Sequence, residues 1–153
     1  MKNVKIAYTP DNLSTFEREW LLHKRCKEWW YATGVMFDDE KNMYSYQYTL
    51  LHINLGIITA KIAMLALIDY TNKRHYYLQT PANRKAPVVI TEKEASIGDI
   101  ASAKKTDTGI NIILNHKDFS LDLMANYGKG AFWHCDNGKL QMGIPGVKET
   151  TLY

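Results

Sequence analysis

The sequence predicts an all-β protein, an antiparallel barrel or sandwich with a short N-terminal helix. From residue 28 onward, apolar and polar residues alternate with a period of two. The alternating runs are short, recur at intervals of roughly ten residues, and are separated by clusters of turn-forming residues. Because strands of parallel βαβ units are usually apolar on both faces, this alternation favours antiparallel sheets.

The N-terminal segment has a different pattern. Ser14-Thr-Phe-Glu17 matches a capping box, in which the serine oxygen accepts a hydrogen bond from the third helical amide. We therefore expect a helix over residues 15–24, either as a surface helix that covers an edge of the sheet or as a lid. The chain accordingly divides into an N-terminal extension, residues 1–27, and a β domain, residues 28–153.

The first strands form the clearest pattern. From Met43 to Ile53, the tyrosines at 44, 46 and 48 share one face with Leu50, and polar side chains occupy the other face. Aromatic residues are frequent in the preceding segment 28–37, and the link 38–42 has the length and composition of a hairpin turn. Residues 28–53 are therefore predicted to form one antiparallel hairpin.

The following segment, Lys61 to Tyr70, is apolar on both faces. It reads as a buried strand, although its alanines leave a helix as the alternative. A turn at 71–74 then leads into a strand at 75–79. Six further strands are expected at Val88–Thr91, Ala95–Ala101, Ile110–Asn115, Phe119–Ala125, Ala131–Cys135 and Lys139–Met142.

Composition excludes several classes of protein. The 153 residues, 46% of them hydrophobic, carry a net charge of +3 and suit a single globular domain. The longest apolar run, 55–68, is interrupted by Lys61 and is shorter than the roughly 20 residues that a bilayer requires, so no membrane span is expected. The N-terminus lacks the apolar core of a signal peptide, which predicts a cytoplasmic protein. Basic residues are scattered, so a nucleic-acid partner is not expected.

No metal site or cofactor is expected either. The two cysteines, Cys26 and Cys135, belong to no Cys-x-x-Cys pair, and we expect reduced thiols, with one long-range disulfide as the alternative. The five histidines show no ligand spacing, and the nucleotide-binding and metalloprotease motifs are absent.

Polar groups within aromatic strands are the candidates for chemistry, because burying an unpaired polar group is costly. Glu28 precedes two tryptophans and could donate a proton if buried, or could pair with a base such as Lys27 or Arg25. Asp69 ends an apolar strand, where turn capping competes with catalysis.

The remaining candidates would bind a ligand. Gln47 could orient a ligand oxygen or bond a neighbouring strand, and His134 could pair with Asp136 or lie in a surface turn. Three aromatic residues are predicted to line a pocket: Trp30, Tyr46 and Tyr48.

Two segments carry a family resemblance. Glu28-Trp-Trp-Tyr-Ala-Thr-Gly34, followed by Tyr44-Ser-Tyr-Gln-Tyr-Thr49, resembles the opening hairpin of the lipocalin-like hydroxyneurosporene synthase family. That family includes carotenoid hydratases and pericyclases. Weaker support comes from Met64–Asp69, Phe119–Leu123 and His134–Gly138, so the likeness covers about residues 28–143. Members usually have two lipocalin-like halves, and this chain looks like the first half. Nothing in it matches the aspartate-histidine-tryptophan-glycine motif of the second half.

The resemblance implies a barrel around an oily hollow that is entered near the double-tryptophan hairpin. It also implies a cofactor-free hydratase or cyclase acting on a polyene, terpenoid or polyketide-derived substrate. Glu28 or Asp69 would then be the acid, and aromatic faces would stabilise a cation. The alternatives are a carrier of lipophilic molecules and a structural half-domain that needs a partner, either a second copy or a second lipocalin-like half.

Overall fold

The protein is described by a computed structural model that covers residues 20–22, 27–54, 56–128, 139–142 and 149–152. Within these ranges every regular element is a β-strand, and every strand pairing is antiparallel. The predicted all-β, antiparallel architecture is therefore confirmed.

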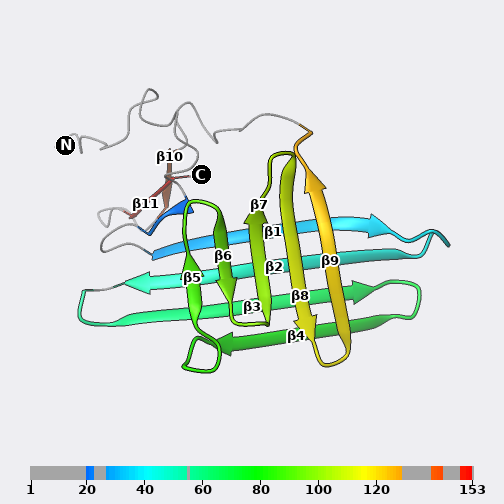
Figure 1. The fold of residues 1–153 in the computed structure, drawn as a ribbon, viewed down its shortest axis with the longest axis horizontal. Helices are drawn as coiled ribbons and strands as arrows, with labels where there is room; N and C mark the ends of the chain where they lie inside the picture. The colour runs from blue at the N-terminus through cyan, green and yellow to red at the C-terminus, as the bar shows by residue number, and fades with distance from the viewer. Residues whose placement is uncertain (1–19, 23–26, 55, 129–138, 143–148, 153) are drawn as a thin grey trace. The chain divides into compact units, whose positions relative to one another are not determined.

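A four-stranded sheet comes first in the chain and has the order β1-β2-β3-β4. Its strands are β1 (Lys27–Phe37), β2 (Met43–Asn54), β3 (Thr59–Asp69) and β4 (Arg74–Pro81). A five-stranded sheet follows in the order β5-β6-β7-β8-β9. It consists of β5 (Val88–Ile90), β6 (Glu94–Ile97), β7 (Ala101–Lys105), β8 (Gly109–His116) and β9 (Phe119–Asn126). We call these the first and the second sheet (Figure 1).

The predicted hairpin over residues 28–53 is confirmed as β1 and β2. Its register runs without a bulge from Phe37 opposite Met43 to Lys27 opposite Ile53. Asp38 organises the turn, because its carboxylate accepts hydrogen bonds from the backbone and the side chain of Asn42 at 2.8 and 2.9 Å. Lys41 adopts a positive φ of 69° there. A short turn with one fixed geometry sets the register of the whole pair.

The segment Lys61–Tyr70, for which the sequence allowed a strand or a helix, forms a strand, β3, up to Asp69. β3 is central in its sheet and pairs along its length with β2 and along most of it with β4. Its buried positions alternate from Ala63 to Asp69, and the residues between them are partly exposed on the other face. Tertiary pairing on both edges therefore outweighs the helix propensity of its three alanines.

The predicted run Ala95–Ala101 is wrong as a single strand, because a turn divides it into β6 and β7. Gly98 at this turn has a φ of +46°, a conformation that L side chains rarely adopt. The amide of Ile100 donates to the carbonyl of Ile97 at 3.0 Å and closes the turn. The other runs expected between residues 75 and 125 are strands, with ends shifted by one or two residues.

The two sheets pack face to face within the unit formed by residues 17–127. In Figure 1, the strands of the second sheet cross those of the first sheet. The inner face of the first sheet is the face that carries Tyr44, Tyr46, Tyr48, Leu50 and His52 of β2. The largest fully buried side chains of the first sheet are Tyr48, Leu50 and Leu65, and those of the second sheet are Ile97, Ile112 and Leu114. Because these residues fill the middle of the sandwich, a guest molecule would not fit among them, and the oily hollow that the resemblance implies does not lie there.

The second unit consists of residues 1–16 and 128–153. Its described strands, β10 (Lys139–Met142) and β11 (Glu149–Leu152), form a two-stranded antiparallel sheet. β10 was predicted, whereas β11 was not. The domain boundary predicted after residue 27 stays a prediction.

Several predictions lie outside the described residues. They include the strand at 131–135, both cysteines and most of the helix over 15–24, of which only residues 20–22 are described and are not α-helical. Among the described residues, none belongs to a helix long and apolar enough to cross a bilayer.

Candidate functional site

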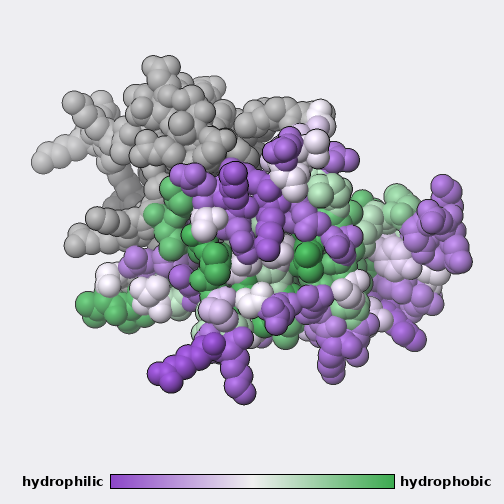
Figure 2. All heavy atoms as spheres, viewed as in Figure 1, coloured by the Kyte–Doolittle hydropathy of each residue, from purple (hydrophilic) through white to green (hydrophobic). Residues whose placement is uncertain are grey.

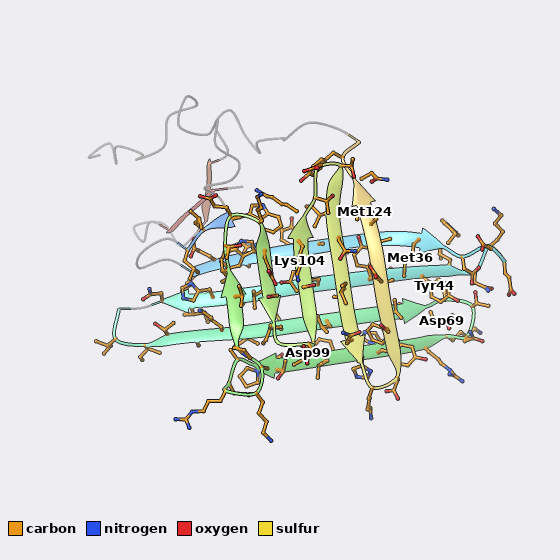
Figure 3. All side chains as sticks on the ribbon, viewed as in Figure 1. Met36, Tyr44, Asp69, Asp99, Lys104 and Met124 are labelled. Atoms are coloured by element: carbon orange, nitrogen blue, oxygen red, sulfur yellow. The ribbon has the colours of Figure 1, made fainter. Side chains whose placement is uncertain are left out.

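The inner face of the first sheet carries polar residues at both ends and apolar residues between them. At one end Met36, Tyr44 and Asp69 are cross-strand neighbours, as Figure 3 shows. At the other end Glu28 lies opposite His52, which also pairs with Lys61 of β3. His52 follows Tyr44 by eight residues, so these two rows are separated by about 26 Å at roughly 3.3 Å per residue. The two predicted acids, Glu28 and Asp69, are therefore not brought together.

Glu28 and His52 form a pair that is largely withdrawn from solvent. The Nδ1 atom of His52 lies 3.5 Å from Oε2 of Glu28, and their side chains are 3% and 14% exposed. Within the described part of the chain, Nδ1 of His52 is buried without a hydrogen bond to any atom. A carboxyl group and an imidazole at this separation can exchange a proton after a small movement of either side chain.

Trp30 lies next to this pair, and Trp20 contacts Trp30. Trp30 occupies the row beside Glu28 and His52, and its Nε1 donates a hydrogen bond to the carbonyl of Trp20 at 3.1 Å. Both indoles are almost fully buried. The Nζ atom of Lys105, at the end of β7, lies 4.7 Å from the centroid of the Trp20 ring, a cation–π contact. We call Glu28, Trp30, His52 and Trp20 the tryptophan end.

Asp69 is held by the β3–β4 turn. Its Oδ1 accepts from the backbone amide of Asn72 at 2.9 Å, and its Oδ2 accepts from the side-chain amide at 2.7 Å. These hydrogen bonds, the backbone one first, lower the pKa of Asp69. A carboxyl group with a lowered pKa is ionised at neutral pH and accepts hydrogen bonds. These contacts are the turn-capping alternative that the sequence left open, and a catalytic role for Asp69 stays a prediction.

The hydrogen bonds of Asp69 predict a pH dependence. The folded-state pKa is depressed, so this group adds stability above its unfolded pKa, about 3.9, and the contribution is lost as pH falls through the lower folded value. We expect the Asp69→Asn variant to unfold at lower urea than wild type at pH 7, and the difference between the two to shrink as the pH falls below about 4. Asp107→Asn, in the exposed β7–β8 turn, is the control. A gap between wild type and Asp69→Asn that stays constant with pH would contradict this account.

Tyr46 and Tyr48 both face inward from β2. Tyr48 is fully buried, and its hydroxyl donates to the carbonyl of Ala95 on β6 at 2.7 Å. Burial, reinforced by the charge of Glu94, raises the pKa of Tyr48, and burial also raises that of Tyr46. The Tyr46 ring lies over Gly34, where a Cβ atom would stand 2.9 Å from Cε1 of the ring. Tyr48 thus joins the two sheets, and its predicted contact with a ligand stays a prediction.

Gln47 and His134 complete the predicted set. Gln47 points to the outer face, is exposed, and donates from Nε2 to the hydroxyl of Thr49 at 3.1 Å. A ligand between the sheets is therefore out of its reach. His134 lies outside the described residues.

His52 is the residue that was not singled out from the sequence. Pairing across the 38–42 turn, with Phe37 opposite Met43, makes the residue numbers of every pair add up to 80, so Glu28 must face position 52. That count was the signal available in the sequence. Among the described residues, no three His, Cys, Asp or Glu side chains converge on a position that could hold a metal ion.

Comparison with known proteins identifies the fold. No protein-family model matches the sequence, and no curated protein matches it. Among solved structures, the chain is similar to a Nitrosomonas europaea protein provisionally named AttH, with a TM-score of 0.71 and 19% sequence identity. The fold is lipocalin-like. The similarity covers 84% of this chain and 42% of the other, so this chain spans less than half the length of its neighbour.

Proposed function

We propose that the protein binds a lipophilic small molecule at the tryptophan end and hydrates or cyclises it without a cofactor. The observation that carries this proposal is the Glu28–His52 pair, with 3.5 Å between Oε2 and Nδ1 beside the buried indole of Trp30. In this position an acid–base pair borders aromatic surface rather than open water. Such surroundings strengthen electrostatic interactions with a developing charge.

Hydration of an isolated double bond illustrates the chemistry. The pair transfers one proton to one alkene carbon, which leaves a carbocation at the other carbon. The face of Trp30 stabilises that cation, and a water molecule adds to it. The oxonium formed then returns one proton to the pair, so alkene and water become alcohol and the protein is unchanged. In cyclisation, a second double bond of the substrate replaces water as the nucleophile. The carbocation that this leaves returns a proton from a neighbouring carbon to the pair, so a new double bond forms and the product is an isomer of the substrate.

The proposal includes a family and a partner. We propose kinship with the hydroxyneurosporene synthase family, which the lipocalin-like fold supports, and a second copy or a second half as the completing partner. The neighbour's greater length, of which this chain covers 42%, supports the proposal of a second half.

The experiment uses an acyclic polyene, lycopene, dispersed in detergent and incubated with the full chain in water enriched in ¹⁸O. We expect an alcohol that carries the heavy oxygen, identified by mass spectrometry, or a cyclised isomer of unchanged mass. Lycopene that co-elutes with the protein but is recovered unaltered would favour a carrier. Lycopene that neither binds nor reacts would contradict the proposal for this polyene, and a polyketide-derived polyene would then be tested in the same way.

The carrier is the second candidate, and one observation favours it. Between the two polar rows, the inner face presents only apolar side chains and tyrosines on β2, and Tyr48 there is already satisfied by Ala95. A ligand held at the edge of this apolar region, away from Glu28 and His52, would be bound without chemical change. The same experiment separates this function from catalysis, because a carrier returns its ligand without heavy oxygen and with an unchanged chromatographic retention, whereas a cyclised isomer has the same mass but a different retention.

A further inference from the structure

The turn between β2 and β3 presents two isoleucines to solvent. Ile57 is 97% exposed and Ile58 is 58% exposed, and Figure 2 shows hydrophobic atoms gathered at this turn, at the left end of the molecule. Among the described residues of this turn, the amide of Gly56 donates to Oδ1 of Asn54 at 3.0 Å, and Gly56 has a φ of +88°. We call Gly56, Ile57 and Ile58 the isoleucine turn.

This turn lies at the tryptophan end of the first sheet. Ile53, at the end of β2, pairs with Lys27 and with Ala60, and the next row inward contains Glu28, His52 and Lys61. The isoleucine turn is therefore nearer to the candidate site than to the Asp69 end of the inner face.

The surroundings of the turn are compatible with lipid headgroups. In the two strand rows nearest the turn, the two lysines Lys27 and Lys61 outnumber the one acid, Glu28. No other aspartate or glutamate occurs on β2 or β3 before Asp69. The net charge of the chain is +3. Basic side chains near an inserted apolar group add electrostatic attraction to anionic lipids.

The shape of the turn favours a bilayer over a protein partner. A stable protein interface buries about 800 Å² on each side, and two isoleucine side chains at the tip of one hairpin supply only a small part of that area. A bilayer needs no matching surface, because apolar side chains leave water by entering the boundary between headgroups and acyl chains. We propose that the isoleucine turn docks the protein on a lipid surface. The proposal goes beyond the proposed function and does not depend on proton transfer by Glu28.

The test is co-sedimentation of the full chain with vesicles of phosphatidylcholine and phosphatidylglycerol. We expect wild type to sediment with the vesicles and the Ile57→Ser/Ile58→Ser variant to partition at least about tenfold more weakly, since two apolar side chains are lost. Val35→Ser/Phe37→Ser is the matched control, because Val35 and Phe37 are 61% and 63% exposed at the other end of β1. The control should partition within about twofold of wild type.

A second variant guards against an effect on folding. Ile57→Trp keeps an apolar side chain on the turn and adds an interfacial anchor, so its partitioning should equal or exceed that of wild type. Equal sedimentation of wild type and the double serine variant would overturn the proposal, and so would no sedimentation of wild type. Light scattering that shows a wild-type dimer and a monomeric serine variant would place a second copy on the turn and also overturn it. The lycopene assay contains no vesicles, so failure of one proposal leaves the other testable.

Discussion

Replacing Gly109 by alanine is expected to destabilise the protein by about 3 kcal/mol. Gly109 begins β8 and lies opposite Asn126 at the end of β9. A Cβ atom there would overlap the backbone oxygen of Ala125 and would come within 2.9 Å of the carbonyl carbon of Ala125 and Cα of Asn126. These are backbone atoms in a paired strand, so relief requires the two strands to separate locally. Both overpacking and weakened pairing contribute to the expected cost.

Gly128→Ala is the matched control for this prediction. It makes the same chemical change close by in the chain, and a Cβ atom at Gly128 would meet nothing within 4 Å. Its effect should lie within about 0.5 kcal/mol of zero. Urea unfolding followed by tryptophan fluorescence measures both variants. Equal stabilities for Gly109→Ala and Gly128→Ala would show that β8 and β9 are not as closely paired at this end as the structure has them.

The strands could be predicted because most of them are half-buried. In β9 the partly buried and exposed positions alternate along its whole length, from Phe119 to Asn126, as the residue pattern predicted. Short turns such as 38–42 then fix which strands are neighbours. The fold class follows from these two local signals, and the similarity to the AttH structure agrees with it.

The division of residues 95–101 could not be predicted in the same way. Ala95, Ser96 and Ile97 are all buried, and so are Ala101, Ser102 and Ala103, so alternation is absent where both sheet faces are covered. The one remaining signal was Gly98, whose positive φ marks the turn. A glycine within an apparently continuous apolar run therefore indicates a turn that divides the run into two strands.

The candidate site was predicted in part for a similar reason. The residue types that favour chemistry were recognised from local context, and Glu28 beside two tryptophans is such a case. Which candidates meet depends on register and on the packing of the two sheets. The strand register places His52 opposite Glu28 and separates both from Asp69. The contact of Tyr48 with Ala95 requires the packing of the second sheet on the first. Only the first of these was accessible from the hairpin count.

The pair at the tryptophan end leads to the second large effect. If lycopene is turned over, Glu28→Gln and His52→Gln are each expected to lower the rate by about 100- to 1,000-fold, because each removes one member of a proton-transferring pair. Glu92→Gln, the same substitution at an exposed glutamate, is the matched control and should retain the wild-type rate. Quenching of tryptophan fluorescence by lycopene should still report binding in all three variants, which separates loss of chemistry from loss of the site.

The double variant decides whether the two residues act together. Residues that act as a unit show strongly non-additive losses, since removing the first already abolishes the shared step. We therefore expect Glu28→Gln/His52→Gln to be about as slow as the slower single variant, whereas independent roles would multiply the two losses. A Glu28→Gln variant with an unchanged rate would remove Glu28 from the mechanism. In that case the 3.5 Å contact with His52 would be a packing feature of the buried end of β1 and β2, and the proton donor would have to be sought elsewhere on the inner face.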